Sequence, residues 1–83
     1  MLGNQWDKLM ERVYNLDKNM RFEDVSKILM NIGYARNQPK GGSSHYIFRK
    51  AHLPPITIPK ANPVKRAYVA LVRDAIIIYE SED

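Results

Sequence analysis

The chain has 83 residues, which is enough for one hydrophobic core but not for two. Its 13 Lys and Arg against 9 Asp and Glu give a net charge of +4, compatible with a polyanionic partner without requiring one. The lack of cysteine excludes disulfides, thiol catalysis and cysteine-ligated zinc, and two histidines without a carboxylate cluster give no reason to expect a metal. No stretch reaches the roughly 20 apolar residues that span a bilayer and no signal peptide opens the sequence, so we expect a cytoplasmic protein.

The first part of the chain predicts two amphipathic helices. Five apolar residues have the spacing of one helical face: Trp6, Leu9, Met10, Val13 and Leu16. Asn4 is the expected N-cap of this helix, which should end at 17–19. A second helix is predicted at about 21–32, with the buried positions Phe22, Val25, Ile28, Leu29 and Ile32. Gly33 follows it, where a left-handed residue closes the last turn.

Three short strands are predicted to follow, at 34–38, 44–50 and 56–58. Pro39 and Pro59 are expected to end the first and the third strand, because proline has no N–H to donate to a strand ladder. The short connection between the first two strands predicts a hairpin.

Side chains of the second strand alternate between the two faces of the sheet. Tyr46 and Phe48 suit the face that covers the core. This leaves His45, Ile47 and Arg49 on the opposite, open face.

Asn62 and Pro63 mark the expected start of a last helix, because an asparagine cap followed by proline at the first helical position is a strong start signal. Its expected buried positions are Val64, Ala67, Tyr68, Leu71, Val72 and Ala75. The next segment, 76–79, is apolar on all sides, so part of it must face solvent, a partner or the first helix. The acidic tail, 80–83, is expected to fray because the helix dipole disfavours negative charge at a C-terminus.

The segment 40–50 reads Lys-Gly-Gly-Ser-Ser-His-Tyr-Ile-Phe-Arg-Lys and carries the candidate chemistry. His45 is the catalytic candidate, because an imidazole can take up and release a proton near neutral pH. On RNA, a base that deprotonates the hydroxyl beside a phosphate would give a cyclic phosphate and a free 5′-hydroxyl without a metal. The alternative for His45 is a histidine at the strand edge that only hydrogen-bonds the neighbouring serines.

Small residues and cations around His45 are the expected substrate contacts. Four small residues could hold a phosphate through their amides and hydroxyls: Gly41, Gly42, Ser43 and Ser44. The same segment could instead serve only as a turn. The expected phosphate-binding cations are Lys40, Arg49, Lys60, Lys65 and Arg66. Arg49 shares a strand face with His45, and the last three cations surround the start of the last helix, where free N–H groups attract phosphate. His52 is expected to be a solvated loop histidine.

The run Gly-Gly-Ser-Ser-His-Tyr-Ile-Phe-Arg, followed by Pro-Ile-Thr-Ile-Pro, resembles the HicA family of toxin–antitoxin ribonucleases, whose hallmark is Gly-Ser-His at the start of the second strand. In this chain two serines precede the histidine and the glycines lie one position earlier. The resemblance implies an α-β-β-β-α fold like that of the double-stranded-RNA-binding domain (dsRBD), an α+β fold with helices on one face of a three-stranded antiparallel sheet. On this interpretation the chain is a single domain, with an extra helix at 1–18, a core at 19–79 and a tail at 80–83.

The resemblance also implies a function, because HicA-like proteins are metal-independent ribonucleases that use one histidine. It implies that this chain is the toxin of a toxin–antitoxin system and cleaves messenger or single-stranded RNA, with His45 as general base and no cofactor. A HicB-type antitoxin would cover the His45 face. Two alternatives stay open. The fold could bind RNA through Arg49 and the cations of the last helix without chemistry, or it could contact a partner protein through Trp6 or 76–79.

Overall fold

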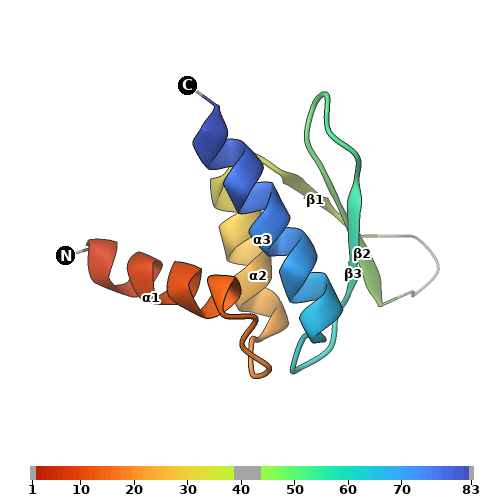
Figure 1. The fold of residues 1–83 in the computed structure, drawn as a ribbon. Helices are drawn as coiled ribbons and strands as arrows, with labels where there is room; N and C mark the ends of the chain where they lie inside the picture. Colours follow the sequence, from red (N-terminus) through yellow and green to blue (C-terminus); the bar gives the residue numbers. More distant parts are fainter. Residues whose placement is uncertain (1, 39–43, 83) are drawn as a thin grey trace.

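The computed structural model describes residues 2–38 and 44–82. These residues form the elements α1 (Leu2–Tyr14), α2 (Phe22–Asn31), β1 (Ala35–Asn37), β2 (His45–Arg49), β3 (Ile56–Pro59) and α3 (Arg66–Ser81), in that order (Figure 1). The predicted order and the α+β class with a three-stranded antiparallel sheet are confirmed. Within the described ranges, no helix combines the length and the apolar character that crossing a bilayer requires.

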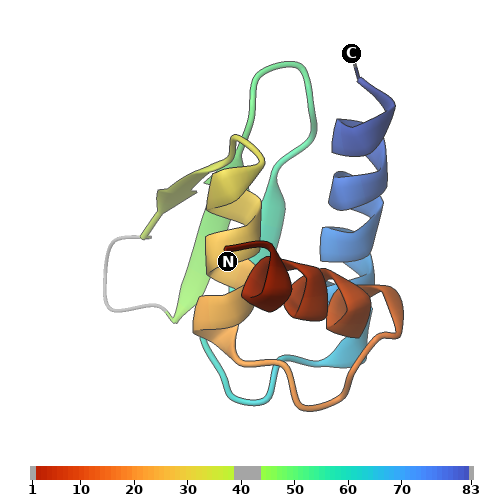
Figure 2. The same ribbon diagram turned by 90° about the vertical axis from the view of Figure 1, so that its left-hand side faces the viewer.

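The sheet has the strand order β1-β2-β3, and each strand is antiparallel to its neighbour. α2 and α3 lie on one side of the sheet, and α1 crosses them on the side away from the strands (Figures 1 and 2). One face of the sheet is therefore covered by helices, while the other faces outward.

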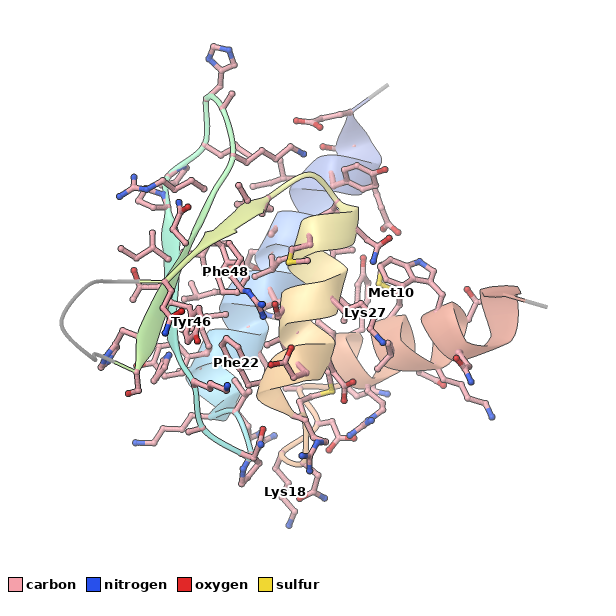
Figure 3. The ribbon with its side chains drawn as sticks, turned by 180° about the vertical axis from the view of Figure 1, so that it is seen from behind. Met10, Lys18, Phe22, Lys27, Tyr46 and Phe48 are labelled. Carbon is pink, nitrogen blue, oxygen red and sulfur yellow. The ribbon has the colours of Figure 1, made fainter. Side chains whose placement is uncertain are left out.

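The alternation of side chains along β2 sets these two faces. Phe48 is buried and Tyr46 is partly buried, and the centroids of their rings lie 6.3 and 5.1 Å from that of Phe22 in α2 (Figure 3). His45 and Arg49 are exposed. The facing predicted for this strand is therefore confirmed.

All three helices and the sheet contribute to one core. Its buried apolar side chains are Val13, Met20, Phe22, Val25, Ile28, Leu29, Ile32, Tyr34, Phe48, Ile56, Ile58, Val64, Val69, Val72, Ala75 and Ile76. Val13 belongs to α1 and is fully buried, so the N-terminal helix shares this core. Trp6 packs against the core and is partly buried.

The end of α2 follows the prediction made for Gly33. This residue has a φ of +107°, a conformation that side-chain-bearing residues rarely adopt. Its N–H donates to the carbonyl of Met30, and the N–H of Tyr34 donates to the carbonyl of Leu29. This pair of bonds is the Schellman arrangement, which satisfies carbonyls that the helix leaves open.

The predicted start of the last helix is wrong. α3 begins at Arg66, so Asn62 is not its cap and Pro63 is not its first residue. Instead, the side-chain oxygen of Asn62 accepts a 2.7 Å bond from the N–H of Phe22, the first residue of α2. The N–H of Val64 donates to the carbonyl of Met20 at 2.7 Å. Asn62 therefore caps α2 rather than the last helix. The two bonds hold residues 62–64 against the start of α2.

Two further predictions at the chain ends are wrong. α1 begins at Leu2, so Asn4 lies inside the helix and is not its N-cap. The predicted fraying of 80–83 is wrong for Glu80 and Ser81, which belong to α3, whereas Glu82 lies beyond the helix as its C-cap residue. Tyr14 of α1 donates its hydroxyl to Glu80 at 2.9 Å, and this bond ties the last turn of α3 to α1.

The buried face of α3 differs in part from the predicted one. The buried residues of the helix are Val69, Val72, Ala75 and Ile76. Of the residues expected to be buried, Val64, Val72 and Ala75 are buried, Tyr68 is partly buried, and Ala67 and Leu71 are exposed. α3 is apolar on two sides, so its periodicity allows two different stripes, and contacts with α1 and α2 select between them.

Candidate nucleic-acid interface

The sheet face that points away from the helices carries the candidate site. In an antiparallel sheet, directly paired residues lie on the same face, so the register aligns three rows across the strands. The rows are His45 with Pro59, then Asn37 with Ile47 and Thr57, then Ala35 with Arg49. Ile47 and Pro59 are half-buried and the other members are exposed. This open face offers an imidazole at one end, a guanidinium at the other and small polar groups between them.

His45 is the first residue of β2 and is exposed. Pairing with β3 fixes the backbone at this point. His45 lies opposite Pro59, and the N–H of Lys60 donates to the carbonyl of Ser44 at 2.7 Å. The exposed Lys60 is therefore anchored by its backbone next to the residue that precedes His45. This places one candidate cation at the His45 end of the sheet.

Arg49 shares the open face with His45, as the alternation predicts, but it lies four residues further along β2. Four residues of extended strand cover about 13 Å. This separation allows Arg49 to contact a different part of an extended ligand from the part that lies at His45.

The cations predicted at the start of the last helix are not equivalent. Lys65 is the exposed N-cap residue of α3, and it makes no side-chain capping bond. The Nε of Arg66 donates to the carbonyl of Leu16 at 3.2 Å, so its guanidinium contacts the α1–α2 connection. The structure brings Lys60 to the His45 end of the sheet and leaves Arg66 against the connection.

Four of the candidate residues, Lys40, Gly41, Gly42 and Ser43, lie outside the described residues. Ser44 is described and exposed, and its carbonyl is the acceptor for Lys60. His52 is exposed in the connection after β2, at the opposite end of that strand from His45, which agrees with the expectation of a loop histidine.

Asn37 and Thr57 form part of the middle row of the open face, and they were not among the candidates. Both carry hydrogen-bonding side chains, and both are exposed on either side of Ile47. Alternation within a strand shows only which of its own residues share a face. Only the register between strands shows that they flank the same residue of β2.

The other face of the sheet is closed by contacts to α2. The guanidinium of Arg36 in β1 donates to the hydroxyl of Ser26 at 3.0 Å and to the carboxylate of Glu23 at 3.3 Å. It also lies 5.5 Å from the ring centroid of Tyr46. A long ligand therefore has access to the sheet from the His45 side.

Among residues 2–38 and 44–82, no three His, Asp or Glu side chains gather in a group that could hold a metal. The expectation that the site works without a metal stays a prediction. Comparison of the chain with protein-family models, with curated proteins and with solved structures finds no match in any of the three.

Proposed function

We propose that this protein is a metal-independent endoribonuclease of the HicA kind, with His45 as its general base. The observation that carries the proposal is the position of His45, which is exposed at one end of the open sheet face and adjoins the backbone pair formed by Ser44 and Lys60. An imidazole at a fixed strand position, with a cation anchored nearby, suits a substrate that carries both a proton to remove and a phosphate to bind.

In the proposed reaction, His45 takes the proton from the ribose 2′-hydroxyl next to the bound phosphate. The freed 2′-oxygen attacks phosphorus, the bond to the 5′-oxygen breaks, and that oxygen takes a proton from water. The products are a 2′,3′-cyclic phosphate and a free 5′-hydroxyl. DNA lacks the 2′-hydroxyl and is therefore not a substrate.

The charged residues have separate roles in this proposal. Lys60 attracts the phosphate that reacts and stabilises the negative charge that develops on it. Arg49, about 13 Å along the strand, binds a neighbouring part of the RNA backbone. Lys65 adds positive charge at the start of α3, where helical N–H groups point outward.

The resemblance to HicA supports the wider biological role in this proposal. The chain is the toxin of a toxin–antitoxin pair and acts on messenger RNA in the cytoplasm. A HicB-type antitoxin neutralises it by covering the open sheet face, which would block His45.

Cleavage of a short labelled RNA by the purified chain in the presence of EDTA tests the proposal. Wild type should cut the RNA and leave a cyclic phosphate, and His45→Ala and His45→Gln should each lower the rate by at least about 100-fold, the usual contribution of a general base. His52→Ala is the matched control, because it removes the other histidine, and it should cut normally. Intact RNA with wild type, or equal cleavage by His45→Ala, would overturn the assignment.

A second candidate function is RNA binding without cleavage. The separation of Lys60, which adjoins Ser44 before β2, from Arg49, at the far end of β2, favours it, because two separated cations can hold an extended backbone with no chemistry at His45. This function predicts RNA binding that weakens with salt, survives His45→Ala and leaves the RNA intact in every variant.

A further inference from the structure

The middle row of the open sheet face places one apolar side chain between two polar ones. Ile47 of β2 pairs with Asn37 of β1 and with Thr57 of β3. Asn37 and Thr57 are exposed, and Ile47 is half-buried. Because neighbouring strands lie about 4.8 Å apart, Asn37 and Thr57 flank Ile47 across about 10 Å. A flat ring that lies on Ile47 would therefore meet a hydrogen-bonding side chain at each edge.

The polar groups of this face are not used by the fold. No hydrogen bond or ion pair between described residues involves the side chains of Asn37, Thr57 or Arg49. On the opposite face of the sheet, in contrast, the guanidinium of Arg36 donates to two side chains of α2. An asparagine amide offers a donor beside an acceptor, and a threonine hydroxyl can serve as either. Both kinds of group are thus open to a ligand on either side of Ile47.

Charge indicates the kind of ligand that this face would take. His45 and Arg49 supply an imidazole and a guanidinium to the paired rows, and none of the row residues is acidic. Each of these two groups lies two residues from Ile47 along β2, which is about 7 Å. An anionic chain that runs along β2 from His45 to Arg49 would therefore pass over Ile47.

A single strand of RNA combines the features that this arrangement would recognise. Its phosphates are anionic, and each unpaired base has a flat face and edges that carry hydrogen-bond donors and acceptors. In a duplex the faces are stacked and the pairing edges are occupied. A base of duplex RNA therefore cannot lie flat on Ile47 and bond to the residues beside it.

We infer that the middle row is a nucleobase subsite, in which one unpaired base of the RNA lies on Ile47 and bonds through its edges to Asn37 and Thr57. This inference rests on the proposed function, because it takes RNA as the ligand of the open face. Ile47 is the next residue of this face after His45, so the base belongs to a nucleotide that flanks the bond cut by His45. Asn37 and Thr57 select the base at that position, and duplex RNA is refused.

Binding by the full-length His45→Gln variant tests the subsite separately from the chemistry. The variant is mixed with a short single-stranded RNA pool of random sequence, and the retained RNA is sequenced. One position should show a base preference of at least about fivefold, the lower end of what one good base contact gives. Adding Asn37→Ala or Thr57→Val should each remove most of this preference. Asn15→Ala, at an exposed asparagine between α1 and α2, is the matched control and should keep it.

Two competitors test the ligand class in the same assay. A retained RNA annealed to its complement should compete at least about tenfold more weakly than the same RNA alone, because its base edges are paired. Polyglutamate at an equal concentration of charge should not displace the RNA. Equal competition by the duplex, or displacement by polyglutamate, would show that charge alone holds the ligand and would overturn the subsite. Circular dichroism checks that each variant is folded.

The outcomes distinguish this inference from the proposed function. When wild type cuts the pool, the same base preference should appear at a nucleotide next to the cut. Cutting without a preference, or with one that persists in both Asn37→Ala and Thr57→Val, would overturn the subsite and leave the ribonuclease standing. Base-selective binding without any cleavage by wild type would overturn the ribonuclease and leave the subsite standing.

Discussion

The side-chain oxygen of Asn62 accepts a 2.7 Å hydrogen bond from the backbone N–H of Phe22, 40 residues earlier in the chain. Phe22 is the first residue of α2, and the residue at the N-cap position, Arg21, makes no side-chain cap bond of its own. One of the unpaired N–H groups at the start of α2 is thus satisfied by a residue from the connection between β3 and α3. The bond joins the start of α2 to the connection that leads into α3.

Asn62→Ala should destabilise the protein by about 1 kcal/mol, the usual contribution of a helix cap, which corresponds to about 5 °C in Tm for a domain of this size. Asn62→Asp keeps the accepting oxygen and adds negative charge at a helix N-terminus, so it should keep the wild-type stability. Urea unfolding followed by circular dichroism measures both. Equal stability of the alanine and aspartate variants would show that the bond to Phe22 contributes nothing.

Gly33→Ala should cost about 1–2 kcal/mol of unfolding free energy, because a φ of +107° strains any residue with a side chain. An added Cβ would also lie 3.1 Å from Cε of Lys50, whose Nζ donates a 2.8 Å bond to the carbonyl of Ile32. The backbone strain should set most of the loss, so the coupling energy between Gly33→Ala and Lys50→Ala in a double-mutant cycle should be small. A coupling energy as large as the loss itself would assign the cost to the Lys50 contact.

Asp17 should make stability depend on pH in the acid range. Its carboxylate accepts bonds from the backbone N–H of Asn19 at 2.7 Å and from Arg12 at 2.9 Å, and these bonds, that of Asn19 first, lower the pKa of Asp17 from its ordinary value. A lowered pKa means that the unfolded chain binds more protons, so the stabilisation is present above the ordinary pKa and is lost as the pH falls through the folded one.

Asp17→Asn should therefore unfold more easily than wild type at neutral pH, and the difference should shrink below about pH 4. Asp7→Asn, at an exposed carboxylate of α1, serves as the control. Thermal unfolding from acid to neutral pH measures the difference between variant and wild type. A difference that stays constant with pH would contradict the contribution of the two bonds.

Lys60 and Arg49 should affect RNA differently, because they lie near opposite ends of β2. Lys60→Ala should lower kcat at least as much as it weakens binding, whereas Arg49→Ala should weaken binding and leave kcat unchanged. A plot of the logarithm of RNA affinity against the logarithm of salt concentration falls with a slope set by the number of phosphate contacts. Each variant should make this slope shallower by about 0.7, the value for one contact on a single strand. Lys27→Ala, at an exposed lysine of α2 on the helical side, is the matched control (Figure 3). A loss of kcat in Arg49→Ala would contradict the separation of roles.

The sequence predicted best those features that depend on neighbouring residues. The alternation of side chains in β2 placed Phe48 inside and His45 outside, because a strand with one buried face leaves no other choice. Gly33 closed α2 as expected, because its left-handed backbone is a local requirement.

The errors arose where distant contacts decide between local alternatives. Asn62 and Pro63 form a valid helix start signal, yet the oxygen of Asn62 is used by Phe22, and no local pattern indicates that contact. The last helix is apolar on two sides, so tertiary contacts had to select Val69 and Ile76 over Ala67 and Leu71. For the same reason the middle row of the open face, with Asn37 and Thr57, could not be assigned without the strand register.

The prolines around β3 limit what can be added to the sheet. The N–H of Lys60 bonds to the carbonyl of Ser44 in β2, and bonding alternates along an antiparallel pair, so positions 55, 57 and 59 direct their backbone groups away from β2. Positions 55 and 59 are prolines, and Thr57 is the one residue of these three with an N–H to offer. An incoming strand would find donors too widely spaced to form a ladder. This edge of the sheet therefore resists pairing with an edge strand of another molecule. It also resists pairing with unfolded, extended peptides, including those present near the chain during its synthesis.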